Sequence, residues 1–323
     1  MKRTSLDQWI KSKHDLDTSD RSAVEQYQLR RIRSLCDYAH SHSKLYARLY
    51  HNFDLPESME AFSHFPMTTA SDLAQRAHEF LCVSQSEITR IVTLQTSGTT
   101  QPSKRVYFTR QDIDLTLDFF EHGMKTLCGP GDSALILFPA KTPDSVGALL
   151  AIALEKLGLT VCCATPEYAE DIFQKQTVDI VCGPASWIFK VAHQTTDCPV
   201  RNVLSSSEVL SEDMRAELTR CWGAEIFDHY GMTETGLGGA VECGAHQGMH
   251  IRENDLYFET IALDGSALPD GEEGELVVTT LTRTGMPFIR YRTGDRGVIT
   301  RERCSCGSLI RRILYVRRIE AVP

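Results

Sequence analysis

The sequence predicts an α/β protein with a parallel sheet flanked by helices and a smaller, mostly antiparallel β subdomain. Two observations support this fold class. Between residues 110 and 228, stretches with helical periodicity alternate with short apolar or β-branched runs, and strands that alternate with single helices form parallel sheets. After residue 231, strand-like runs are separated by glycine-containing turns, a pattern typical of antiparallel pairing.

In order along the chain, these patterns predict three segments. Residues 1–90 form a helical N-terminal segment, residues 91–230 the α/β body, and residues 231–323 the β-rich subdomain. Within the first segment, Thr69 followed by Asp72 is typical of a helix start. A buried helical stripe is predicted at Leu29, Ile32, Leu35 and Tyr38.

Composition limits the classes of partner. The chain has 323 residues with 34 basic and 43 acidic side chains, so its formal net charge is −9. This charge argues against binding to nucleic acid or to an anionic membrane surface, and small molecules are the expected partners. The amino terminus lacks the apolar core of a signal peptide, and the apolar runs are shorter than the roughly 20 residues of a bilayer span. We therefore expect a cytoplasmic protein whose singly placed cysteines are reduced.

The first motif that indicates chemistry is TSGTTQPSK. Hydroxyl side chains surround a glycine, and Lys104 follows shortly after. A glycine turn lets backbone N–H groups face an anion, and hydroxyls with a lysine complete a cradle for a polyphosphate. An ordinary polar turn is the alternative. The residues of this predicted loop are Thr96, Ser97, Gly98, Thr99 and Thr100.

Two further motifs follow predicted strands. FDHYGMTETG, residues 227–236, places a hydroxyl beside a carboxylate where α/β sheets bind ligands. MPFIRYRTGDRG, residues 286–297, places Asp295 on a glycine turn, where its carboxylate could accept two ribose hydroxyls. A solvated β-turn and a hairpin with an Asx turn are the respective alternatives.

Together the three motifs resemble the adenylate-forming superfamily, and the MPFIRYRTGD wording resembles its phenylacetate-CoA ligase-like branch. The resemblance implies an AMP-forming carboxylate ligase of the acyl-CoA synthetase type, which uses ATP, Mg²⁺ and coenzyme A. By family analogy its acid is aryl or otherwise apolar. Two alternatives remain: transfer of the acyl group to a protein thiol, and a nucleotide-binding or regulatory subunit with little turnover.

The resemblance also implies residue roles. The loop at residues 96–100 would enclose the β and γ phosphates. Lys104, Thr233 and Glu234 would form the catalytic group, with Thr233 at the α phosphate and Glu234 holding magnesium. The remaining nucleotide contacts would be Ser207 and Glu208 near the adenine, Tyr230 stacked on it with the adjoining Gly231, and Asp295 at the ribose.

In this superfamily a mobile carboxy-terminal lid follows a hinge and supplies a lysine for adenylation. Here the sequence stops at residue 323, where the hinge would be, so the resemblance implies slow adenylation by this chain unless another group replaces the lysine. A separate lid-supplying protein is one candidate partner, and a homodimer is another. The further alternative is that this sequence is a truncation of a longer chain that includes the lid. The candidate substitutes within the chain are Arg311, which we expect to contact the nucleotide, and Arg312, Arg317 and Arg318.

A polar group of cysteines predicts a metal site. Cys243, His246, Cys304 and Cys306 provide three thiolates and one imidazole, a set that suits structural zinc. His250 is the rival fourth ligand. The alternative is that these are ordinary reduced cysteines beside a turn.

Overall fold

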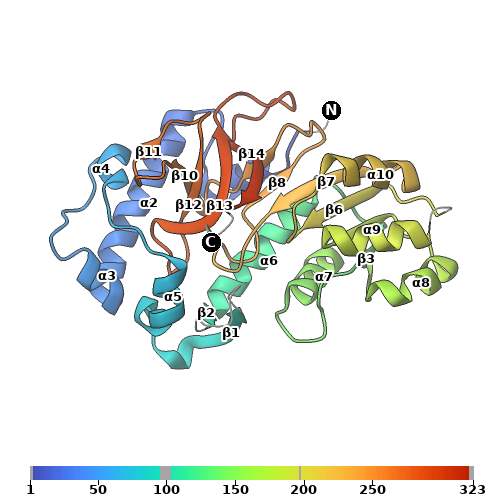
Figure 1. Cartoon of the computed structure of the whole chain (residues 1–323), viewed down its shortest axis with the longest axis horizontal. Coiled ribbons are helices and arrows are strands. Elements are labelled where there is room, and N and C mark those ends of the chain that lie inside the picture. Colours follow the sequence, from blue (N-terminus) through green and yellow to red (C-terminus); the bar gives the residue numbers. More distant parts are fainter. Residues whose placement is uncertain (1–2, 95–102, 196–197, 320–323) are drawn as a thin grey trace.

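The computed structural model describes residues 3–94, 103–195 and 198–319. Its N-terminal part is helical, and most of its helices lie at the left of the molecule in Figure 1. Thr69 and Asp72 form a reciprocal capping box at the start of α5, which confirms the predicted helix start. The helices of this part are α1 (Leu6–His14), α2 (Arg21–His42), α3 (Lys44–Leu49), α4 (Met59–Ser63) and α5 (Ala70–Arg76), followed by the 3₁₀ turns η1 (Ala77–Phe80) and η2 (Gln85–Glu87).

An antiparallel hairpin and a long helix follow. The hairpin pairs β1 (Ile88–Leu94) with β2 (Lys104–Thr109), and α6 (Arg110–Met124) begins directly after it. A capping box between Thr109 and Asp112 fixes the start of α6. The last residue of β2, Thr109, is the N-cap of α6, so Lys104 lies at the end of β2 farthest from this helix.

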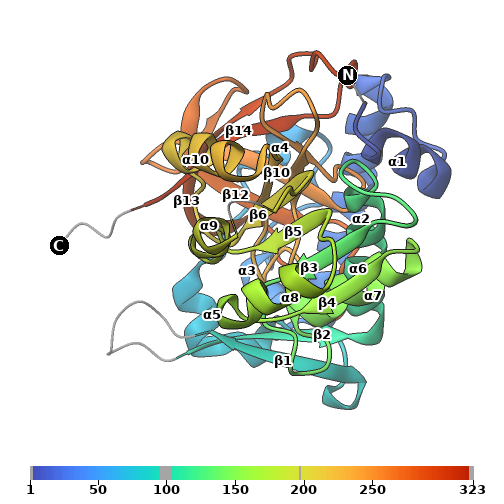
Figure 2. The same cartoon turned by 90° about the vertical axis from the view of Figure 1, so that its right-hand side faces the viewer.

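The predicted alternation of helices and strands is present between residues 133 and 230. The five strands are parallel in the order β4-β3-β5-β6-β7. Figure 2 shows α9 and α10 on one side of them and α6 and α7 on the other. The elements are β3 (Ser133–Ile136), α7 (Val146–Lys156), β4 (Thr160–Cys163), η3 (Pro166–Tyr168), α8 (Ala169–Lys175), β5 (Ile180–Gly183), α9 (Ala185–Gln194), β6 (Asn202–Ser206), α10 (Glu212–Trp222) and β7 (Glu225–Tyr230).

The antiparallel strands continue this sheet. β8 pairs with the last parallel strand, β7, so within the described residues one sheet of twelve strands runs from β4 to β11. The sequence pattern did not predict this continuity, because a periodicity does not specify which strand edge the next strand joins. The additional strands are β8 (Ala240–Glu242), β9 (Met249–Ile251), β10 (Leu256–Ile261), β11 (Ala267–Leu268), β12 (Glu273–Thr280), β13 (Tyr291–Thr300) and β14 (Arg312–Arg318).

The core occupies both faces of the parallel strands. On β5 and β6, Val181 and Val203 pack into the cluster that includes α9 and α10, whereas Cys182 and Leu204 belong to the cluster on the other face. This alternation follows from the two-residue period of a strand. The eleven cysteines all lie among the described residues, and none of them forms a disulfide. Among the described helices, none combines the length and the apolar character that a bilayer crossing requires.

Candidate functional site

A cavity of about 900 Å³ opens at the carboxyl ends of β6 and β7 and reaches β13 and β14. Loops at this edge of a parallel sheet are where ligands bind in α/β proteins. Its lining includes these predicted residues: Lys104, Ser207, Glu208, Tyr230, Gly231, Thr233 and Asp295. Lys104 and Asp295, which are about 190 residues apart in the sequence, therefore line one cavity.

Glu234 lies beneath this cavity and is almost completely buried. One of its carboxylate oxygens, Oε1, lies 2.8 Å from Lys104 Nζ and accepts a hydrogen bond of 3.0 Å from the Tyr291 hydroxyl. A buried carboxylate needs such a counter-charge, because desolvation without a partner costs several kcal/mol. Lys104 and Glu234, which were predicted to act together, are thus in direct contact.

Asp295, on β13, also lines the cavity. Its Oδ2 accepts a hydrogen bond of 2.9 Å from the Tyr230 hydroxyl, and its Oδ1 accepts one of 2.8 Å from Arg318 Nη1. The preceding Gly294 has a φ of +75°, so the turn that orients the carboxylate requires a left-handed residue. Each carboxylate oxygen can accept a second hydrogen bond, which leaves capacity for a ligand hydroxyl.

Ser207 and Glu208 form the loop after β6. Ser207 has a φ of +73°, an uncommon conformation for a residue with a side chain. The Glu208 carboxylate accepts hydrogen bonds from the Ser186 backbone N–H at 2.7 Å and the Ser186 hydroxyl at 2.9 Å, at the start of α9. The loop is thereby tied to the neighbouring helix while it lines the cavity.

The predicted phosphate loop, Thr96 to Thr100 with Ser97, Gly98 and Thr99 between them, lies outside the described residues. Its role stays a prediction. Lys104, which follows it, is the part of this motif that the structure places at the cavity.

The prediction that Arg311 contacts the nucleotide is corrected by the structure. Arg311 is buried; its Nε lies 3.1 Å from Glu253 Oε1, and its Nη2 donates to the Phe258 carbonyl at 2.7 Å. It does not line the cavity, because its side chain points into the core of the antiparallel strands. Among the four carboxy-terminal arginines, Arg318 is the one whose guanidinium contacts a predicted site residue.

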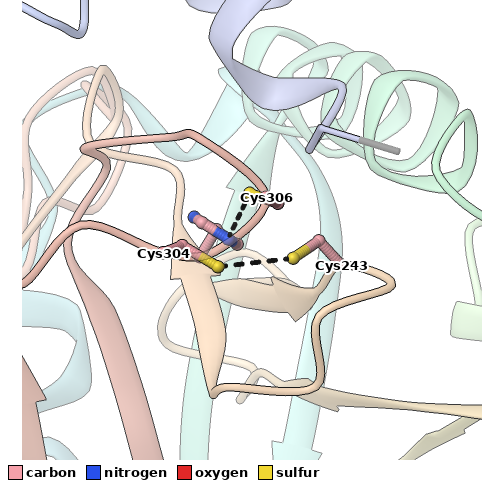
Figure 3. A group of neighbouring side chains, drawn as sticks. Cys243, Cys304 and Cys306 are labelled. Atoms are coloured by element: carbon pink, nitrogen blue, oxygen red, sulfur yellow. Dashed lines mark hydrogen bonds between the residues drawn. The ribbon is translucent and has the colours of Figure 1, made fainter. Parts of the chain in front are cut away.

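The predicted metal ligands are also largely brought together. The ligand atoms of Cys243, Cys304, Cys306 and His250 lie within 4.8 Å of one another, and all four residues are buried. Figure 3 shows the Cys243 and Cys304 sulfurs facing each other, 3.7 Å apart, and Cys306 Sγ is 3.7 Å from His250 Nε2. Tetrahedral zinc with bonds of about 2.3 Å to sulfur places two sulfurs about 3.8 Å apart, so this donor set fits the metal.

The fourth member is His250 and not His246, which corrects the first choice from the sequence. His246 Nδ1 lies 3.2 Å from Glu242 and its Nε2 lies 3.1 Å from Glu225. A φ of +49° at His246 turns its side chain toward β7, whereas His250 on β9 faces the cysteines. Burial raises the pKa of the Cys306 thiol, but the hydrogen bonds from His250 and from the backbone of Ser308 and Thr4, together with the charge of His250, outweigh burial and lower the pKa to about 6.

Two residues of β7 belong to the cavity but were not predicted as site residues. His229 Nδ1 lies 2.8 Å from the Ser206 hydroxyl, and burial together with the charge of Arg252 lowers the pKa of His229 to about 4. A neutral imidazole therefore faces the cavity at pH 7. Burial and the charge of Glu242 raise the pKa of Asp228 to about 7. No local pattern could reveal Asp228, because Glu242 comes from another strand.

The raised pKa of Asp228 predicts a pH dependence of stability. Between about pH 4 and 7 the folded chain holds a proton that the unfolded chain has released, so the free energy of unfolding falls as the pH rises through this window. Asp228→Asn should remove this slope and be more stable than the parent by about 4 kcal/mol at pH 8. Urea unfolding from pH 4.5 to 8 measures this pH dependence, and Asp114→Asn, which changes an exposed side chain on α6, is the control. Parallel curves for parent and Asp228→Asn would refute the assignment.

Comparisons with known proteins agree with this arrangement. Residues 119–282, a little over half of the chain, match the AMP-binding enzyme family. The chain is 30% identical over 308 residues to phenylacetate-coenzyme A ligase of Aromatoleum evansii and 28% identical over 305 residues to that of Pseudomonas putida, covering in each case 87% of this chain and 67% of the relative. It thus spans about two thirds of the length of these relatives.

A solved structure shows the same fold. The complex of 2-hydroxyisobutyryl-CoA ligase with 2-HIB-AMP and CoA superposes with a TM-score of 0.82 at 22% identity, covering 94% of this chain and 70% of that one. The twelve-stranded sheet and the cavity lined by Lys104, Tyr230 and Asp295 are therefore accompanied by a family match and by phenylacetate-coenzyme A ligases among the relatives. This chain belongs to the family of AMP-binding enzymes and is a homologue of the phenylacetate-coenzyme A ligases.

Proposed function

We propose that this protein activates a carboxylic acid with ATP, giving an acyl-adenylate and pyrophosphate, and then transfers the acyl group to coenzyme A. The observation that supports this proposal is the shared cavity, which is lined by Lys104 and Asp295, with the buried Glu234 paired to Lys104. In the first step a carboxylate oxygen forms a bond to the α phosphorus of ATP, and the bond from that phosphorus to the bridging oxygen breaks. Pyrophosphate leaves with that oxygen.

The side chains have distinct roles in this proposal. Asp295 accepts hydrogen bonds from the ribose hydroxyls, and Lys104 Nζ leaves Glu234 to meet a phosphate oxygen. Glu234, a buried carboxylate with Oε2 free of these contacts, would hold magnesium, which neutralises charge on the phosphates when bound. Thr233 lines the cavity next to it and would donate to the α phosphate. The chain thus contributes positioning and charge, which dominate phosphoryl-group chemistry.

The acid is proposed to be apolar. One wall of the cavity is formed by apolar side chains of α6, α7, β6 and the segment that follows β3, and the neutral His229 lies 6.1 Å from the Phe119 ring in this wall. An apolar wall favours an uncharged acyl or aryl group, because burial of a second charge would be unfavourable there. The names of the relatives, phenylacetate-coenzyme A ligases, agree with such an acid. The wall consists of Phe119, Phe120, Met124, Phe138, Leu150 and Leu204.

The acceptor is proposed to be coenzyme A, which the names of the relatives and the CoA complex of the structural neighbour support. Transfer to a protein thiol and a nucleotide-binding role with little turnover are the competing functions. Product analysis distinguishes transfer to coenzyme A from transfer to a protein thiol, since only transfer to coenzyme A gives an acyl-CoA. The second competitor predicts nucleotide binding without acid-dependent chemistry.

The test is acid-dependent exchange of pyrophosphate into ATP. We expect exchange with phenylacetate and little with succinate, whose second carboxylate would have to enter the apolar wall. Glu234→Gln should lower the exchange rate about a hundredfold, because it removes the charge that holds the metal. Glu272→Gln, an exposed change near β12, serves as the control. Thermal stabilisation by Mg·ATP with no exchange for any acid would favour the nucleotide-binding role.

We also propose that Cys243, His250, Cys304 and Cys306 bind one structural zinc. All four positions would be filled by protein atoms, which leaves no open position for catalysis. The site would connect the β8–β9 region to the loop before β14, two segments that flank the cavity. It would thereby support the site without taking part in the reaction.

A further inference from the structure

Three consecutive carbonyl groups behind the cavity are each held by a buried side chain. The Glu234 carbonyl accepts from Arg283 Nη1 at 3.2 Å, the Thr235 carbonyl accepts from Arg252 Nη2, and the Gly236 carbonyl lies 2.9 Å from the Thr116 hydroxyl. The Thr116 proton is shared with the Asp112 carbonyl at 3.1 Å. The backbone of Glu234, Thr235 and Gly236 is therefore held by a side-chain hydrogen bond at each of the three residues.

The three donors come from separate parts of the fold. Thr116 lies on α6, Arg252 follows β9, and Arg283 follows β12. Their exposed fractions are 1%, 4% and 4%. At Gly236, which has a φ of +74°, an added Cβ would lie 3.3 Å from Arg252 Nη2, so the glycine allows the close approach. Donors that meet at one loop from three elements fix the position of the loop relative to the whole body.

The two arginines are themselves immobilised. The Arg283 guanidinium lies 4.4 Å from the Phe108 ring centroid, and its Nη2 donates to the Tyr107 carbonyl of β2. The Arg252 guanidinium lies 4.8 Å from the ring of Phe119, which lines the cavity. Rings that stack on a guanidinium restrict its rotation, so each donor is presented in one geometry.

The burial of two guanidinium groups is not explained by a gain in the stability of the fold. Burial of a guanidinium is unfavourable, and burial lowers the pKa of Arg252 and of Arg283. The nearest carboxylate oxygen of Asp112 lies 3.8 Å from Arg283 Nε, which is too far for a hydrogen bond. Well-packed apolar side chains would fill such space at least as favourably. Buried charges that serve a loop bearing a site residue indicate a positioning role.

We propose that Thr116, Arg252 and Arg283 are positioning residues that hold the loop at residues 233–236, so that the Glu234 carboxylate meets Lys104 at the cavity. The catalytic consequence rests on the function proposed above, whereas the structural consequence does not. The competing explanation is that the loop holds itself. Its Thr235, Gly236 and Leu237 amides donate to carbonyls of Met232 and Thr233 at 3.0–3.1 Å. Those bonds set the shape of the turn, but not its placement against the body.

The same amides provide the measurement. Amide hydrogen exchange at residues 235–237 reports on opening of the loop and needs no ligand. In Thr116→Val, which keeps the shape of the side chain, we expect amide exchange to be about 3-fold faster than in the parent. In Arg252→Met or Arg283→Met we expect exchange to be faster by about 10-fold or more, because each variant loses a buried hydrogen bond from a charged group. Arg252→Lys should restore part of the protection. Arg110→Met, an exposed change on α6, is the control.

A second measurement links the loop to the site. The KM for Mg·ATP should rise in the same order as the exchange rates, while protection of amides in β5 and β6 stays at the parent value. If the parent protein binds no nucleotide but the variants still show faster loop exchange, the positioning role stands and only the proposed function is refuted. Unchanged exchange at residues 235–237 in Thr116→Val and in a folded arginine variant would overturn the positioning proposal.

Discussion

Asp295→Ala is expected to weaken Mg·ATP binding about a hundredfold. The carboxylate would take two ribose hydroxyls, and hydrogen bonds to a charged group contribute about 1.5–3 kcal/mol each. The variant also removes the acceptor for Tyr230 and Arg318, which hold Asp295 at 2.9 and 2.8 Å. Isothermal titration of Mg·ATP measures the loss. In a thermal melt, the shift given by saturating nucleotide in the parent protein should nearly vanish at the same concentration.

Tyr230→Phe provides the matched comparison for this prediction. It removes one hydrogen bond to Asp295 and keeps the ring, so we expect a loss of only about threefold to tenfold. Asp264→Ala, on the exposed turn between β10 and β11, should bind like the parent. Equal affinities for the parent and Asp295→Ala would show that the ribose does not lie at this carboxylate.

Cys304→Ser is expected to release the structural metal and to lower stability by several kcal/mol. Binding of zinc by three thiolates and an imidazole contributes to the folded state alone, so its loss appears directly in the free energy of unfolding. Protein purified without chelator should contain about one zinc per chain, and the variant almost none, by elemental analysis. Hydrogen exchange should increase most near residues 243–250 and 304–310, with β3 and β5 less affected.

Two histidines make this test specific. His250→Asn should lose the metal as Cys304→Ser does, whereas His246→Asn should keep it, because His246 contacts Glu225 and Glu242 instead. Cys36→Ser changes a buried thiol on α2, away from the four ligands, and should keep the zinc. A parent protein free of zinc, or a His250→Asn variant with full metal content, would contradict the metal assignment.

The sequence predicted those parts of the fold that depend on local pattern. The alternation between residues 110 and 228 indicated a parallel sheet, and the Thr69–Asp72 pair located a helix start, because periodicity and capping act within a few residues. The motifs also indicated that Lys104, Glu234 and Asp295 belong to one site, although only the structure shows the contacts between them.

The errors and omissions concern side-chain direction and partners distant in sequence. His246 and Arg311 have suitable chemistry, but a positive φ turns the first away from the cysteines, and the second points into the core toward Glu253. Arg252 and Arg283 gave no signal, because their targets are backbone carbonyls of a distant loop. A sequence contains no local record of such contacts, since they depend on the completed packing.

In the proposed complex a nucleotide lies between Asp295 and Glu234 with an apolar acyl group beside it. A crystal structure of the chain with a hydrolysis-resistant acyl-adenylate analogue would reveal this arrangement. We expect ribose hydroxyls within hydrogen-bond distance of Asp295, the phosphoryl mimic near Thr233 and Lys104, and the acyl group against Phe119 and its neighbours. An analogue bound outside this cavity, or an empty cavity at saturating analogue concentration, would refute the proposed site.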